Sequence, residues 1–446
     1  MRQIPQPSGF GVANGLRFTS NPLRFLEGIQ ARFEDVAAIP VPGRAPLVII
    51  TNPTLVHEAL SRSEEFGRFE PLSAATLISE QGLVQSEGNL HQQQRGIVQS
   101  AFTGQQIKAY ANTVGERVDE LATEWRDIGA GGEQLNLHRE MTTLTIRVAS
   151  EILLGEDIGR DRAQQFYEWM QVSGEEFELS LSAFLPGSSA EFKRSAEGIR
   201  RLSKEIIERR RETLETASGE SKDMLALLLE AEDDPSVEYA PNQIRDEVAT
   251  FLIAGHETTA LSLTYTLSLL SAHSKFREQI REEARTVLGN SPTTPRYEHV
   301  SELTDTRRVY DESLRLYPPA WAVFREANAE TRLGEYRVEK GSAIIMPQWS
   351  IHRDRRYFER PEAFNPDRWQ KQDPNTTEAY FPFASGPHAC IGRQFALSGA
   401  TLTIARLLHE FEIDVVDGAL ETLQPTASLR PSEGIQAAVR PLIHTR

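Results

Sequence analysis

The chain has 446 residues, a formal net charge of −16 at pH 7 and one cysteine. The acidic balance argues against a nucleic-acid partner, and a single cysteine excludes an internal disulfide and a cysteine-based zinc cluster. The first residues lack the apolar core of a signal peptide, and no uncharged apolar stretch of about 18 residues occurs, so we expect a cytoplasmic protein without a membrane span. Only seven of the 48 basic residues are lysines, which suggests a high-salt host or a GC-rich genome.

The N-terminal half predicts one early strand and then mostly helices. Arg44–Pro53 is rich in apolar and β-branched residues, which favours a strand followed by a turn. Asn52 can cap a helix that has Pro53 at its first position. From residue 104 to residue 217 the pattern is helical, with breaks expected near residues 129–132 and 186–187.

The longest periodic segment opens at Pro241 and predicts a helix of about 30 residues, roughly 45 Å long. Its middle is apolar on nearly every side, so we expect it to be buried on nearly every side. A second helix follows over residues 276–289, and a third is stopped by Pro318 and Pro319.

The C-terminal part predicts two strands in residues 334–347, around a turn at Lys340–Gly341, and one more apolar helix after Cys390. No alternation of strands and helices indicates a parallel sheet. We therefore expect a mainly α fold with small β-sheets (α+β), organised as a single domain over residues 1–446.

The only cysteine lies in a glycine-rich loop with the pattern F-x-x-G-x-H-x-C-x-G. It is formed by Phe383, Gly386, His388, Cys390 and Gly392. Glycines allow a tight turn, and the helix that follows adds partial positive charge, so both features favour a thiolate. With no second cysteine and no H-E-x-x-H pattern, the candidate ligand is a metal carried by a cofactor. The alternative is a buried, inert cysteine.

This loop resembles the haem-binding loop of the cytochrome P-450 (haem-thiolate monooxygenase) family, of the soluble prokaryotic type. The resemblance implies one cytochrome P-450 fold with a long central helix across the haem. It also implies that Cys390 is the proximal thiolate ligand of the iron in haem b, with Phe383 beside the sulfur and Gly392 within the haem-binding loop. The family usually has arginine where this chain has His388.

The long helix carries the sequence AGHETT, from Ala254 to Thr259. Ala254 and Thr258 are four residues apart and share one face, where the small alanine leaves room for a ligand beside the haem. The segment resembles the oxygen-activating motif of the same family. By that resemblance Thr258 and Glu257 are catalytic and deliver protons during oxygen activation. The alternative is a buried helix whose polar residues only satisfy their neighbours.

Two further motifs resemble the family in the expected order. Glu312 and Arg315 form E-x-x-R, a pattern that is weak evidence alone because such pairs are common on surfaces. Arg368, in the segment FNPDRW, would join them in a buried triad that fixes the cysteine loop, a structural role.

Haem has two propionates, which need cationic partners. His91 and Arg95 lie four apart on one predicted helix, and Arg325 and His388 also stand at positions that match the family's propionate contacts. For each residue alone, a solvated basic side chain is the simpler interpretation.

The resemblance implies a monooxygenase that inserts one atom of dioxygen into an apolar small molecule, such as a fatty acid, terpenoid, steroid or polyketide. Electrons would come from a separate ferredoxin and ferredoxin reductase (or a flavodoxin) docking near Cys390, where Arg393 could contribute, because no fused reductase domain is expected. Two alternatives stay open: a peroxygenase that uses hydrogen peroxide, and a non-catalytic haem protein that senses a gas or carries electrons. A helical binding module without haem is a further, weaker alternative.

Substrate selection is expected from the less patterned segments, residues 70–87 and 171–192, and from the segment after Pro319. The apolar residues that suggest an apolar ligand are Phe177, Leu181, Phe184 and Leu185.

Overall fold

The computed structural model describes residues 2–7, 11–69, 78–183, 189–216, 223–235, 237, 239–289, 293–416, 418, 420–432 and 434–442. Part of the expected substrate-selecting segments, including Phe184 and Leu185, lies outside these residues, as do the side chains of Phe177 and Leu181.

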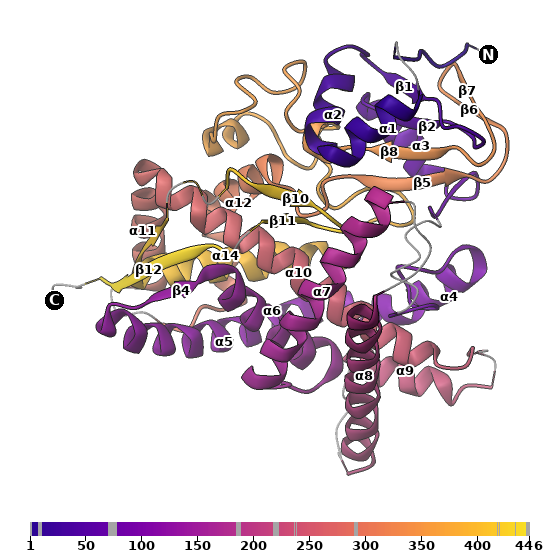
Figure 1. Cartoon of the computed structure of the whole chain (residues 1–446). Coiled ribbons are helices and arrows are strands. Elements are labelled where there is room, and N and C mark those ends of the chain that lie inside the picture. Colours follow the sequence, from indigo (N-terminus) through magenta and orange to yellow (C-terminus); the bar gives the residue numbers. More distant parts are fainter. Residues whose placement is uncertain are drawn as a thin grey trace.

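The described chain is mainly helical, with the largest sheet at one side and smaller sheets elsewhere in the molecule (Figure 1). The helices are α1 (Gly11–Ser20), α2 (Pro22–Gln30), α3 (Pro53–Ser61), α4 (Gly88–Gln99), α5 (Gly104–Gly131), α6 (Leu137–Leu154), α7 (Arg160–Ala183), α8 (Ala190–Thr216), α9 (Met224–Glu232), α10 (Gln243–Ala272), α11 (Ser274–Leu288), α12 (Thr304–Leu316), α13 (Gln348–Ile351) and α14 (Arg393–Glu410). Short 3₁₀ turns cover Ser100–Phe102, Tyr297–Ser301 and Pro366–Gln370.

The strands form four sheets, of which the largest has the order β1-β2-β8-β5-β3. The others pair β4-β12-β9, β6-β7 and β10-β11. Their bounds are β1 (Val36–Ile39), β2 (Leu47–Ile50), β3 (Phe66–Gly67), β4 (Gln134–Asn136), β5 (Val323–Ala327), β6 (Thr331–Leu333), β7 (Tyr336–Val338), β8 (Ala343–Met346), β9 (Phe411–Val415), β10 (Leu423–Pro425), β11 (Leu429–Pro431) and β12 (Gln436–Pro441).

The N-terminal prediction of a strand, a cap and a helix is confirmed. β2 is followed by α3, and the Asn52 side chain accepts the N–H groups of Thr54 and Leu55 at 2.9 and 3.4 Å. Pro53 occupies the first turn, where its missing N–H costs nothing. This local sequence is therefore sufficient to set the helix start.

The two strands predicted around Lys340–Gly341 are present, but they belong to different sheets. β7 pairs with β6, whereas β8 pairs with β5 and, in parallel, with β2. Gly341 takes φ +76° in the connecting turn, and the chain passes there from one sheet to the next. The β2–β8 pair is parallel, a contact that short-range sequence patterns do not encode.

The long helix α10 has 30 residues and starts at Gln243, two residues after the predicted Pro241. It packs along α6 and also contacts α8, α12 and α14, so it crosses the helical part of the molecule (Figure 1). Nearly all of its side chains are buried, as the sequence predicts. This position makes α10 the central wall of the interior.

Two of the helices between α5 and α8 end at a glycine. Gly132 takes φ +71° where α5 ends, at the break predicted near residues 129–132. Gly155 takes φ +74° and ends α6, a break that was not predicted. The break expected at residues 186–187 lies outside the described residues.

One hydrophobic cluster extends from Ile4 to Val439 and includes side chains of α5, α6, α10 and α14. A second cluster packs α2 against the first sheet, around Leu26 and Trp321. Within the described ranges, no helix is long and apolar enough to span a membrane, and no group of three or more His, Cys, Asp or Glu side chains is arranged to hold a metal ion.

Candidate active site

The cysteine loop is a tight turn that leads into α14. The Cys390 N–H donates to the Phe383 carbonyl at 3.0 Å, and Gly392 immediately precedes the helix. Gly386 has φ +74°, and a Cβ at this position would lie 2.2 Å from the Leu60 carbonyl oxygen. A side chain at residue 386 therefore does not fit, which explains the first glycine of the motif.

Cys390 is exposed on one side, although protein atoms fill most of the space around its sulfur. Burial raises the pKa of its thiol, and the Gly392 N–H, Arg95 and Arg393 lower that pKa by less. The backbone N–H at the helix start does favour the thiolate, as expected, but desolvation outweighs this contribution and the net pKa lies above its usual value. A bound metal ion would stabilise the anion directly and so favour the thiolate.

Basic side chains from α4 meet the cysteine loop. The ring centroids of His91 and His388 lie 3.9 Å apart, and His388 Nε2 lies 3.6 Å from Glu87 Oε2. Arg95 is half-buried and makes no hydrogen bond or ion pair with any residue that the structure describes. Such a cation, withdrawn from bulk water without a partner, points to a negatively charged ligand.

Arg325 on β5 adds a further positive charge to this cluster. Burial lowers the pKa of Arg325, and Glu87, whose own pKa burial raises, offsets this only in part. Burial also lowers the pKa of His91, and burial and the neighbouring cations take the pKa of His388 to about 4. Two added carboxylates would balance the charge and accept the unused hydrogen bonds. The cluster therefore fits the two propionates of a haem.

Ala254 and Thr258 form a small exposed strip on α10. Between Gln243 and Leu270 they are the two exposed residues, and they lie one turn apart. Thr258 Oγ1 donates to the Ala254 carbonyl at 3.2 Å, a back-bond that threonine within a helix commonly makes. The strip therefore faces space rather than packed protein.

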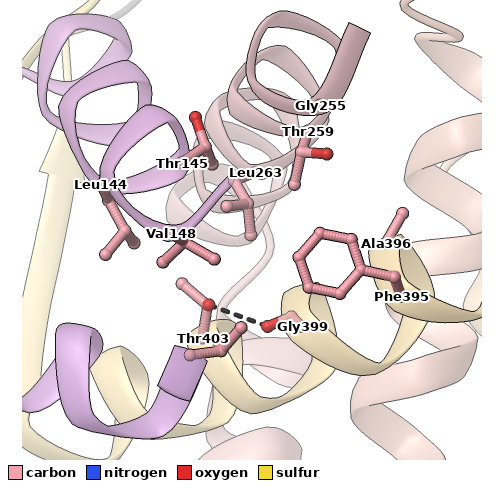
Figure 2. Close-up of a pocket in the computed structure, with 11 residues that line it drawn as sticks. Leu144, Thr145, Val148, Gly255, Thr259, Leu263, Phe395, Ala396, Gly399 and Thr403 are labelled. Carbon is pink, nitrogen blue, oxygen red and sulfur yellow. Dashed lines mark hydrogen bonds between the residues drawn. The ribbon is translucent and has the colours of Figure 1, made fainter. Parts of the chain in front are cut away.

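The region beside this strip also borders the start of α14. Figure 2 shows Gly255 and Thr259 on one side of a cavity and Phe395 and Ala396 on the other. Because Phe395 lies five residues after Cys390, α10 and the cysteine loop flank the same part of the interior.

Glu257 is buried next to Thr258 in sequence, but its hydrogen bonds lead elsewhere. The Ser428 hydroxyl donates to Glu257 Oε1 at 2.7 Å, and Arg430 Nε donates to the same oxygen at 2.6 Å. Burial opposes ionisation, but Arg430, His256 and Ser428 together outweigh it, so the pKa of Glu257 lies below its usual value. The acid and the alcohol thus point to different sides of α10.

Arg430 was not identified from the sequence, although it is the main partner of Glu257. It comes from β11 and also donates to the Met170 carbonyl on α7 at 2.9 Å. A Cβ on Gly174 would lie 2.0 Å from Arg430 Nη1, so glycine there makes room for the guanidinium. Arg430 and Glu257 are 173 residues apart, and no local pattern links them.

The helix around Glu257 is held in place by polar contacts. His256 is fully buried, its Nδ1 lies 2.5 Å from the Leu252 carbonyl, and its ring packs against Phe166. Thr145 Oγ1 on α6 lies 3.1 Å from the His256 carbonyl. His256 therefore lies within the packed side of α10.

The structure brings Glu312, Arg315 and Arg368 into contact. Arg315 donates to both carboxylate oxygens of Glu312, at 3.0 and 2.9 Å, and Arg368 Nε lies 3.0 Å from Oε2. The Asn365 N–H donates to Glu312 at 2.9 Å. Glu312 and Arg315 are completely buried, so every charge in the cluster is paired inside the protein.

A chain of hydrogen bonds connects this cluster to the cysteine loop. Arg315 donates to the His352 carbonyl at 2.8 Å, and the His352 ring accepts the Phe381 N–H at 3.1 Å. The Gln348 amide donates to the Phe381 carbonyl at 2.6 Å. Because residue 381 begins the segment that leads to Cys390, the buried cluster supports the loop from behind.

The cysteine loop, the basic cluster and the alcohol-bearing helix together form a site that fits a haem with a thiolate ligand. The family model described as Cytochrome P450 matches residues 5–439. The chain is 32% identical over 378 residues to a cytokinin hydroxylase of Arabidopsis thaliana, covering 81% of this chain and 72% of that protein. It is 30% identical to cyclooctatin synthase of Streptomyces melanosporofaciens, covering 96% and 94%, and 27% identical to pentalenene oxygenase of Streptomyces avermitilis, covering 94% and 91%.

The chain therefore belongs to the cytochrome P450 family and is a haem-thiolate monooxygenase. Its mainly helical fold with small sheets agrees with that family. Monooxygenases of this family incorporate an atom of dioxygen into apolar substrates and take electrons from redox partners.

Proposed function

We propose that Cys390 is the thiolate ligand of haem b and that the chain uses it to hydroxylate or epoxidise a terpenoid. The main support is the exposed sulfur of Cys390 and the basic cluster beside it. His388, on the same loop, packs against His91 in that cluster, where Arg95 and Arg325 carry positive charge. Bound haem would supply dioxygen activation and transfer of one oxygen atom to the substrate. Two electrons and two protons enter for each product, and water leaves.

The assignment of Cys390 is tested by the absorption of the ferrous carbonyl adduct. Cys390→Ser should lose the spectrum that a thiolate ligand gives, and Cys390→His should bind haem but give the spectrum of a nitrogen ligand. An unchanged spectrum in Cys390→Ser would contradict the proposal. The histidine variant separates the loss of sulfur from the loss of haem.

His91, Arg95, Arg325 and His388 would hold the propionates, and Phe383 and Gly392 would shape the loop around the sulfur. Arg95 has the clearest support, since it makes no hydrogen bond or ion pair with any described residue. Ala254 would leave room for substrate and oxygen above the cofactor. The haem would thus be bound within one domain.

Thr258 would donate its hydroxyl hydrogen toward the reacting oxygen, because it is exposed on the side of α10 that faces open space. Glu257 would relay from solvent the proton that replaces it. In the observed geometry Glu257 is ionised and paired with Arg430, so proton transfer requires this pair to loosen. Arg430 is then a positioning residue that fixes where the carboxylate lies and keeps it ionised.

The relatives support a terpenoid substrate. Two of the matched proteins are named cyclooctat-9-en-7-ol 5-monooxygenase and pentalenene oxygenase. We expect terpene hydrocarbons and alcohols to shift the haem absorption by displacing water, and fatty acids of similar size to do so at least tenfold more weakly. Equal or stronger shifts with fatty acids would overturn the terpenoid assignment without affecting the monooxygenase class.

We further propose that a ferredoxin, reduced by its own reductase, docks beside the cysteine loop in the cytoplasm. A hollow of about 310 Å³ opens there, lined by His57, Phe383 and Arg393 among others. Arg393 donates to Asn375 at 2.7 Å at its rim. Arg393→Gln should slow reduction by ferredoxin while leaving dithionite reduction unchanged.

A further inference from the structure

A small, partly enclosed cavity lies beside the active-site turn of α10. The space open to the centre of a water molecule is about 20 Å³, enough for one small molecule. Its wall comes from α5, α6, α10 and α14 (Figure 2). The lining residues are Val114, Leu144, Thr145, Val148, Gly255, Thr259, Leu263, Phe395, Ala396, Gly399 and Thr403.

The wall of this cavity offers few hydrogen-bonding groups to a water molecule. The Thr145 hydroxyl lies 2.8 Å from the Met141 carbonyl, and the Thr403 hydroxyl donates to the Gly399 carbonyl at 2.8 Å. In Figure 2 the Thr259 hydroxyl points away from the side of the cavity that Val148 forms. A buried water needs two to four polar partners, so a void lined mainly by carbon stays dry and favours an apolar occupant.

The cavity lies next to both halves of the reaction site. Gly255 and Thr259 directly follow Ala254 and Thr258 on α10. Across the void, Phe395 belongs to the first turn of α14, the helix that begins three residues after Cys390. A molecule held here would be separated from the oxygen-activating region by little more than one turn of helix.

We propose that this cavity binds dioxygen and holds it next to the site where it reacts. Dioxygen is small and apolar, so it prefers a dry apolar void to water. The role as an oxygen store rests on the monooxygenase function proposed above, but the binding itself does not. No polar or charged substrate suits this wall.

Xenon is the probe for the cavity, because it is an apolar atom of similar size that gives strong anomalous scattering. Crystals of the haem-loaded enzyme under xenon pressure should show one xenon between α10 and α14. Gly399→Ala should reduce the occupancy at least threefold, since its new Cβ would sit 3.5 Å from Val114 Cγ2, an ordinary contact on the cavity wall. Val148→Leu, which adds a methylene from α6, should do the same.

Gly28→Ala is the matched control. It also replaces a helix glycine, with nothing within 4 Å of the new Cβ, but lies on α2 away from the cavity. It should keep full xenon occupancy. Absence of xenon from the wild type, or equal occupancy in Gly399→Ala and Gly28→Ala, would overturn the proposal.

The dioxygen role is tested by stopped-flow mixing of the ferrous enzyme with oxygenated buffer. Association should be about threefold slower in Gly399→Ala than in Gly28→Ala. Equal rates would overturn the assignment of dioxygen even if xenon binds. A failure of the monooxygenase function would instead remove product from every variant and leave the xenon site intact.

Discussion

Two buried carboxylate–arginine clusters in this protein use the same chemistry in different ways. Glu312 is bonded by Arg315 and Arg368, and both arginines also donate to backbone carbonyls nearby. Glu257 is bonded by one arginine, Arg430, and by Ser428, from strand and loop segments far along the chain. The first cluster closes on itself, whereas the second joins three separate elements beside the active site.

The two clusters differ in how firmly the carboxylate is held and in whether it can readily change its protonation state. In the Glu312 cluster every hydrogen-bonding position of the carboxylate is used, so protonation or rotation would break several contacts at once. In the Glu257 cluster both donors meet one oxygen, Oε1. The second oxygen is less constrained, which suits a carboxylate that must accept and release a proton.

The largest expected effect is the loss of Glu312. Glu312→Ala leaves two buried arginines without a counter-charge, which costs about 3–5 kcal/mol. Because the cluster supports the segment leading to Cys390, we expect little haem-loaded protein. Haem content per chain and the urea midpoint of the loaded fraction measure this.

Glu312→Gln is the matched variant, since it keeps the shape and some hydrogen bonds but removes the charge. It should lie between wild type and Glu312→Ala in haem content. Normal haem content in Glu312→Ala would show that the triad does not hold the loop.

Removing Arg430 should affect chemistry more than folding. Arg430→Gln takes away the charge that keeps Glu257 ionised, so the pKa of Glu257 should rise and product formed per electron should fall about tenfold or more. The pH profile of coupling should shift upward, a readout that a purely structural role would not move.

Arg430→Lys separates charge from shape in that experiment. Lysine restores a positive charge without the planar guanidinium and should recover part of the original pH profile. If Arg430→Gln and Arg430→Lys both reproduce the wild-type profile, Arg430 does not position Glu257.

The sequence predicts the Glu312 cluster more completely than the Glu257 cluster, for a physical reason. Glu312 and Arg315 are one helical turn apart, and the resemblance of FNPDRW to a family motif adds Arg368, so the spacing and that resemblance together predict all three residues. The partner of Glu257 comes from β11, and only the tertiary fold brings it to α10. The degree of burial around Cys390 cannot be read from the sequence either, and its effect on the thiol pKa opposes the predicted contribution of the helix start.

The fold shows the same division. Asn52 and Pro53 set the start of α3 through contacts within three residues, and this was predictable. The pairing of β8 with β2 depends on residues about 300 positions apart, and no local pattern contains it. Helix caps and helical periodicity can therefore be predicted from the sequence, whereas strand partners and long-range ion pairs cannot.

Thr258 should show a smaller effect than Arg430. Thr258→Ala removes a hydroxyl that is exposed toward open space, so stability should change by less than about 0.5 kcal/mol. Coupling of electrons to product should fall several-fold, with peroxide released instead.

Thr258→Ser keeps the hydroxyl and should stay near the wild-type coupling, and Thr258→Val keeps the branched shape without it. Hydrogen peroxide and product are quantified in the same reaction. Wild-type coupling in Thr258→Val would rule out proton delivery through this residue.

Glu247 extends the comparison to a buried carboxylate with no arginine bonded to it. It accepts the Leu83 N–H at 2.9 Å, and burial, together with Asp246, raises its pKa to about 8. The folded protein therefore binds this proton more tightly than the unfolded chain. The contribution to stability is full below about pH 4.5 and is lost as the pH rises to about 8, on the order of 5 kcal/mol over that window.

Glu247→Gln should remove this pH dependence while keeping the bond to the Leu83 N–H. Urea unfolding of the haem-loaded protein at pH 5, 6.5 and 8 should show the variant gaining stability relative to wild type as the pH rises. The exposed Glu64→Gln is the control and should follow wild type throughout. Parallel curves for Glu247→Gln and wild type would mean that Glu247 is ionised in the folded protein, and that a buried carboxylate here needs no arginine to stay charged.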